Sequence, residues 1–150
     1  MSTMTFNRKS MPVLPELRPM YKIAKVLIFL KLCSSGNKAS LLKLHLFNWA
    51  YIDSNRVKAL QLSVEKKELY VGVWGIDPAL NMALGFALAD QLIEKKANGM
   101  YQLTDKGDSF IKESDLINLF DSEIIEFKKI GKKITESMIN NATRRWVNEI

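Results

Sequence analysis

Residues 78–107, PALNMALGFALADQLIEKKANGMYQLTDKG, decide the fold class of this chain. Asp77 and Pro78 form a typical helix start, because Asp can cap free backbone N–H groups and Pro suits the first helical position. The apolar run that follows predicts a helix from Pro78 to about Leu92.

A hairpin is predicted directly after this helix. Strands at 94–96 and 100–104 flank Asn98-Gly99, a pair that tolerates the positive φ angles of a tight turn. A further helix is predicted over 105–113. A helix followed by a hairpin is how a winged-helix domain meets DNA, so the pattern predicts a winged-helix-like frame.

The rest of the chain has a mostly helical pattern. Apolar periodicity and turn residues predict helices at 20–33, 41–51, 55–67 and 118–147, and a short strand at 70–74. The first of these helices is apolar on most faces, with Lys22 and Lys25 on one polar edge. The predicted fold class is mainly α: a winged-helix-like helical domain with a small β-hairpin wing and a long C-terminal helix.

Three parts are expected along the chain. Residues 1–18 contain two prolines, with a third at 19, and are interpreted as a flexible N-terminal arm. Residues 19–115 form the winged-helix-like domain, and residues 116–150 a C-terminal helical extension that packs on the domain or on a partner.

Composition favours a globular protein of the cytoplasm. Of its 150 residues, 47% are hydrophobic and 25% charged, which is typical of a chain that builds a core. Its apolar runs fall short of the roughly 20 residues needed to span a membrane, and no signal-peptide pattern is seen. The single Cys33 indicates a reduced, buried thiol, so we expect a cytoplasmic protein with no membrane contact.

The sequence offers little for catalysis, which needs convergent polar groups. His45 is the only histidine, and its apolar neighbours favour a structural role. One His and one Cys do not make a zinc site, and neither a phosphate-binding loop nor a catalytic triad is readable. We therefore expect no enzyme activity and no cofactor.

Positive charge is concentrated in the first third of the chain. Residues 1–50 carry eight Lys and Arg against one acid, whereas residues 51–150 are nearly balanced. Such a region can attract nucleic acid, or it can be a solvated surface. The candidate nucleic-acid contacts, including those of the wing, are Arg8, Lys9, Lys38, Lys95 and Lys96.

The helix at 78–92 does not suit base reading. Groove-reading helices present Arg, Lys, Asn or Gln to bases and phosphates, whereas this helix has no cation and carries Asp90, which repels phosphate. Its apolar residues cover most of the circumference, which indicates a helix buried inside this chain or under a partner.

The C-terminal helix carries an apolar seam with spacings of four and three. It predicts either a packing helix with a solvated outer face or an arm that binds a partner. Gly131 within the seam allows close approach or a bend. The candidate partner-interface residues are Phe120, Ile124, Phe127, Ile134 and Met138.

Four stretches between residues 20 and 110 resemble one known family. They are KVLIFLKLCSSGNKASLLKLHLFNWAY, Asn55-Arg56, GIDPALNMALGFALADQLI and YQLTDKG, and the more specific part is Asp-Pro-x-Leu-x-x-Ala-Leu-x-x-Ala followed by Leu-Thr-x-x-Gly. Together they resemble the middle component of three-component ABC/SMC-type systems, the class that includes the Lamassu anti-phage systems.

The resemblance implies a small non-catalytic subunit. Such a subunit binds an SMC-like ATPase and an effector subunit of nuclease or other toxic type, in an assembly that senses phage DNA. The sequence thus leaves two hypotheses: an adaptor subunit that also makes non-specific contacts with double-stranded DNA, or a free-standing winged-helix transcriptional regulator that binds DNA directly.

Overall fold

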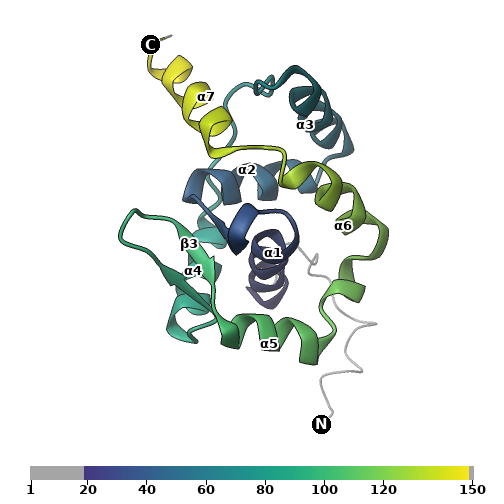
Figure 1. Ribbon diagram of the computed structural model, residues 1–150, viewed down its shortest axis with the longest axis vertical. Coiled ribbons are helices and arrows are strands. Elements are labelled where there is room, and N and C mark those ends of the chain that lie inside the picture. The colour runs from purple at the N-terminus through teal and green to yellow at the C-terminus, as the bar shows by residue number, and fades with distance from the viewer. Residues whose placement is uncertain (1–18, 149–150) are drawn as a thin grey trace.

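The computed structural model describes residues 19–148, and within them the chain is mainly helical with one small sheet (Figure 1). The helices, in chain order, are α1 (Pro19–Leu32), the short 3₁₀ turn η3 (Ser35–Asn37), α2 (Leu41–Tyr51), α3 (Ser54–Lys66), α4 (Pro78–Ala89), α5 (Asp105–Ser114), α6 (Ile117–Gly131) and α7 (Glu136–Asn148). The strands are β1 (Lys38–Ala39), β2 (Ile93–Lys95) and β3 (Tyr101–Leu103). This is the expected helical domain with a small hairpin wing.

The sheet has the order β1-β3-β2 and is antiparallel throughout. β1 is too short to be seen in the sequence pattern and was not predicted. The hairpin lies where the sequence predicts it: Lys96 N–H donates to the Met100 carbonyl at 2.7 Å and Gly99 N–H donates to the Lys96 carbonyl at 2.9 Å. Gly99, at φ 88°, therefore ends a three-residue loop in a left-handed conformation.

α1 lies at the centre of the domain, with the other helices around it (Figure 1). Its residues from 22 to 30 are buried, as the apolar pattern predicts, but the expected polar edge is wrong. Lys22 is only 5% exposed and pairs with Asp77 at 2.8 Å, while Lys25 lies between the rings of Tyr21 and Tyr51. A carboxylate beside Lys22 and aromatic rings beside Lys25 make these buried positions tolerable for lysine.

The C-terminal part consists of two helices rather than one long helix. The break falls at residues 132–135, and the Thr135 hydroxyl accepts a hydrogen bond from Met138 N–H at 3.1 Å, as a capping residue does. Gly131 packs so closely on Cys33 that a Cβ atom at this position would overlap it. The bend and the close approach that this glycine allows both occur here.

The segment predicted as a strand at 70–74 is instead an extended connection between α3 and α4. Within residues 19–148, no strand lies beside it to complete a sheet. Its first amide, Tyr70 N–H, donates to the Ser63 hydroxyl at 2.9 Å. Trp74 is buried against Trp146 of α7, with ring centroids 4.6 Å apart, so a side-chain contact holds this connection.

Candidate interaction surface

The start of α4 is fixed by a polar network that reaches three helices. Asp77 caps the helix by accepting from Ala79 N–H at 2.9 Å, and it also accepts from Lys22 of α1 at 2.8 Å and Asn48 of α2 at 3.1 Å. Partial burial raises the pKa of the Asp77 carboxyl, but the bonds from Lys22, Ala79 and Asn48 outweigh it and hold this pKa below its ordinary value. Asp77 is therefore a carboxylate that holds α4 in place.

His45 of α2 completes this network. Its Nδ1 accepts from Asp77 N–H at 3.2 Å, and its Nε2 lies 2.8 Å from the Asn81 side-chain oxygen. A backbone N–H can only donate, so Nδ1 carries no proton and Nε2–H donates to Asn81. Burial lowers the pKa of His45 against the opposing effects of Asn81 and Asp77, and the ring is neutral.

α4 has one buried face and one exposed face. Leu80, Ala83, Leu84 and Ala87 point into the core, whereas Met82 is 62% and Phe86 48% exposed. Ala79, Gly85 and Ala89 are exposed beside these two side chains, and α4 contains no Lys or Arg. Within residues 19–148, α4 is therefore covered on one side only, and an apolar outward face is exposed. This face is defined by Ala79, Met82, Gly85, Phe86 and Ala89.

The wing does not form an unopposed basic patch. Lys96 pairs with Glu94 at 2.9 Å, and Lys95 lies 5.8 Å from the centroid of the Tyr101 ring. Lys38 of β1 is exposed and faces Gln102 of β3, which in turn faces Glu94 of β2. The structure thus brings the three wing lysines to one small sheet, with an acid among them.

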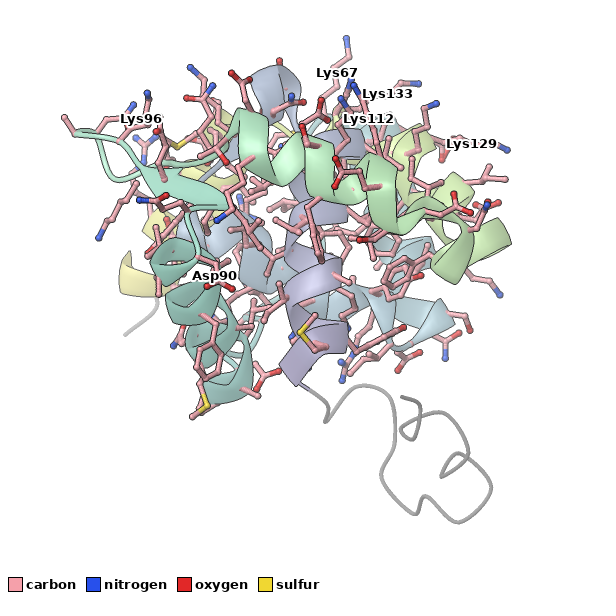
Figure 2. The ribbon with its side chains drawn as sticks, turned by 90° about the horizontal axis from the view of Figure 1, so that it is seen from below. Lys67, Asp90, Lys96, Lys112, Lys129 and Lys133 are labelled. Atoms are coloured by element: carbon pink, nitrogen blue, oxygen red, sulfur yellow. The ribbon has the colours of Figure 1, made fainter. Side chains whose placement is uncertain are left out.

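Several exposed lysines lie away from the hairpin. Figure 2 shows Lys96 at the hairpin and Asp90 at the end of α4, whereas Lys67, Lys112, Lys129 and Lys133 are drawn away from the hairpin. Arg8 and Lys9, the remaining candidate nucleic-acid contacts, lie outside the described residues.

The candidate partner seam is buried in this chain's own core, so its assignment to a partner is a correction that the structure requires. The most exposed of the five side chains retains only 8% of its accessible surface. Phe127 of α6, for example, packs on Phe29, Phe47 and Tyr51 of α1 and α2, because α6 itself lies against these two helices. The buried residues are Phe120, Ile124, Phe127, Ile134 and Met138.

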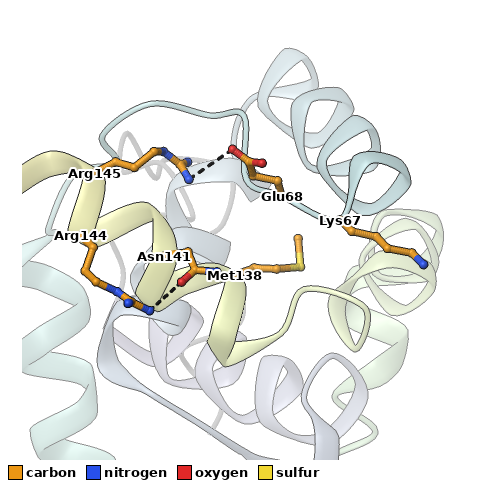
Figure 3. A pocket seen from close by; sticks show the side chains of 6 residues that line it. All are labelled: Lys67, Glu68, Met138, Asn141, Arg144 and Arg145. Carbon is orange, nitrogen blue, oxygen red and sulfur yellow. Dashed lines mark hydrogen bonds and ion pairs between the residues drawn. The ribbon is translucent and has the colours of Figure 1, made fainter.

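A hollow of about 340 Å³ lies between the end of α3 and α7, and the sequence reading missed it (Figure 3). Its two arginines are already engaged: Arg145 donates to the Leu69 carbonyl at 2.8 Å and lies 3.4 Å from Glu68, and Arg144 donates to Asn141 at 2.6 Å. The contacts of Arg145 at this hollow therefore join α7 to the connection at residues 67–77. Its two walls are far apart in sequence, so no local pattern could reveal it.

Reactive side chains are few in the part of the chain that the structure describes. Burial raises the pKa of Cys33 to about 12 against the effects of Lys43 and Lys132, so its thiol is protonated. Among residues 19–148, no group of three or more His, Cys, Asp or Glu could hold a metal ion. Within the same residues, no helix is long and apolar enough to cross a bilayer.

Comparison with protein-family models, with curated proteins and with solved structures gives no significant match to this chain. The likeness to the middle component of ABC/SMC-type systems is therefore limited to the four sequence stretches between residues 20 and 110.

Proposed function

We propose that this chain is a non-catalytic adaptor subunit of the cytoplasm that binds an SMC-like ATPase through the outward face of α4. In this role it links the ATPase to an effector subunit of nuclease type in bacterial anti-phage defence. One observation carries the proposal: the helix that precedes the wing presents Met82 and Phe86 to solvent where a DNA reader needs cations.

The chemistry of this face supports a protein partner. Complete burial of a Met or Phe side chain contributes on the order of 2 kcal/mol, and aromatic and Met side chains are enriched where proteins associate. The small residues Gly85 and Ala89 beside them allow a partner backbone to approach closely. A phosphate backbone gains nothing from these groups, and Asp90 at the end of the helix repels it.

Contacts with double-stranded DNA are a secondary part of the proposal. Lys38 and Lys95 are exposed on the wing and are suited to phosphate contacts, which add affinity without reading sequence. In the adaptor role, the ATPase holds the DNA and these lysines supplement its grip.

Co-purification tests the adaptor role. The full chain is expressed in its native host with an affinity tag, and a large ATPase is expected to co-purify and to remain bound at high salt. Phe86→Glu should abolish capture, whereas Leu62→Glu, which changes an exposed apolar residue on α3, should not. Capture that survives Phe86→Glu, or that is lost on raising the salt, contradicts binding through this face.

A gel shift separates the regulator hypothesis from the adaptor. The purified chain should not retard plain duplex DNA at micromolar concentration without its partner. Strong retardation that weakens steeply with salt, and that Lys38→Ala and Lys95→Ala reduce, favours the free-standing DNA-binding regulator instead.

A further inference from the structure

The connection between α3 and α4 contains a stretch of unpaired backbone. At residues 72–76, the chain forms no helix, turn or sharp bend and is therefore extended. No backbone N–H or C=O group of these residues forms a hydrogen bond with any part of the chain that the structure describes. They thus present a row of free donors and acceptors, as the edge strand of a sheet does.

The composition of this region lacks the residues that keep edge strands from associating. Residues 69–76 read LYVGVWGI, which is rich in the β-branched and aromatic residues that favour strands. They include no Lys, no Pro and no charge of either sign, although proteins blunt exposed strand edges with such residues. An edge of this kind promotes disordered association when it stays open, so its composition indicates that an ordered contact covers it.

The side chains along the free backbone suit a second strand. Val73 retains 67% and Ile76 52% of its accessible surface, whereas Trp74 between them is buried against α7. A Cβ atom added at Gly72 or Gly75 would meet nothing within 4 Å. The glycines therefore leave space beside the backbone, and the buried tryptophan holds the segment in place before a partner arrives.

Charge at the borders of the segment allows a second copy of the chain to approach. The two bordering acids are already paired: Glu68 lies 3.4 Å from Arg145, and Asp77 lies 2.8 Å from Lys22. Two copies therefore meet here without unpaired like charges. Antiparallel pairing of identical segments is also closed by two-fold symmetry, so it covers the edge on both chains and stops at a dimer.

We propose that residues 72–76 of two copies of this chain pair as antiparallel strands and form a homodimer. In a pair centred on the middle residue of this segment, Val73 lies opposite Gly75 of the second copy. Ile76 lies opposite its Gly72, so each large exposed side chain faces a residue without one. The dimer goes beyond the adaptor role and does not depend on it, because that role uses the outward face of α4.

Amide hydrogen exchange of the full chain tests the backbone pairing. Because residues 72–76 have no acceptors among the described residues, their amides should exchange quickly at low protein concentration. At high micromolar concentration, alternate amides should slow several-fold as the strands pair. Exchange that stays fast at every concentration overturns the proposal. Protection that does not change with concentration also overturns it, because the chain itself then covers the segment.

The molar mass in solution tests the dimer independently. By light scattering, the native chain should approach the mass of two copies as its concentration rises. Val73→Asp introduces a charge and a poor strand former into the pair and should keep the protein monomeric over the same range. Leu62→Asp is the matched control, because it places the same charge at an exposed apolar residue of α3 and should leave the dimer intact. A native chain that stays monomeric, or a dimer that survives Val73→Asp, overturns the proposal.

Discussion

His45 is fully buried, yet both of its ring nitrogens have partners. A protonated ring would place an N–H at Nδ1 against the N–H of Asp77, two donors facing each other. This residue is therefore required in its neutral form, and its role is to hold the start of α4.

Stability should depend on the protonation of His45. Its pKa is lowered from 6.5 by burial, so the unfolded chain binds a proton more readily than the folded chain. The full contribution of neutral His45 to the free energy of unfolding is present above about pH 6.5. It is lost as the pH falls from there toward the lowered pKa of His45. Urea unfolding of the native chain should show this loss, and His45→Gln should have a flatter profile over the same window.

A profile that is equally steep in both proteins would contradict this role for His45. The contribution of Asp77 to stability can be distinguished from that of His45 because it is lost in a different pH range. Because the pKa of Asp77 is held below 3.8, its contribution is present above about pH 4 and is lost only at lower pH.

Replacing two helical glycines by alanine should change the stability of the fold in opposite directions. Gly131→Ala places a methyl group against Cys33 and should destabilise the fold by about 1–3 kcal/mol. Gly85→Ala meets nothing within 4 Å and should stabilise the fold by about 0.5–1 kcal/mol through helix propensity. Denaturant unfolding measures both values, and effects of the same sign would refute this account of their packing.

At the scale of elements, α3 and α4 start in the same way but are held differently. Asp53 and Asp77 each accept from the N–H two residues later at 2.9 Å. Only Asp77 also neutralises a buried lysine, Lys22. The two caps therefore form a matched pair, and the main difference is that the cation beside Asp77, Lys22, is buried.

Replacing each cap by alanine separates these effects. Asp53→Ala should cost about 1 kcal/mol, the usual contribution of a cap. Asp77→Ala should cost about 2–4 kcal/mol, because Lys22 then remains buried without its carboxylate. Thermal unfolding of both variants tests the difference, and equal losses would mean that the Lys22 contact adds nothing to the cap.

For the whole molecule, the C-terminal helices are part of the core. Phe127→Ala should cost about 3–5 kcal/mol, because the ring fills space among Phe29, Phe47 and Tyr51. Ile125→Ala, on the same helix but exposed, should change stability little. Circular dichroism and tryptophan fluorescence should report one shared transition in the native chain, whereas an earlier fluorescence change would indicate that α7 detaches first.

The sequence predicted what local patterns determine. Asp77-Pro78 gave the start of α4, and Asn98-Gly99 gave the hairpin, because caps and turns depend on neighbouring residues. It did not predict that the seam through Phe127 turns inward or that Lys22 is buried. Both depend on partners distant in the chain, and an apolar stripe looks the same whether its own domain or another protein covers it.

The pairing of Trp74 with Trp146 has a consequence for synthesis. During translation, the connection from Leu69 to Ile76 is made long before the helix that covers Trp74, and Arg145, which holds the Leu69 carbonyl, follows equally late. Until then Trp74 is exposed beside Tyr70, Val73 and Ile76, which remain exposed in the folded chain. Until α7 is made, the nascent protein thus exposes a longer apolar tract that favours aggregation, and folding of α7 withdraws Trp74 from it.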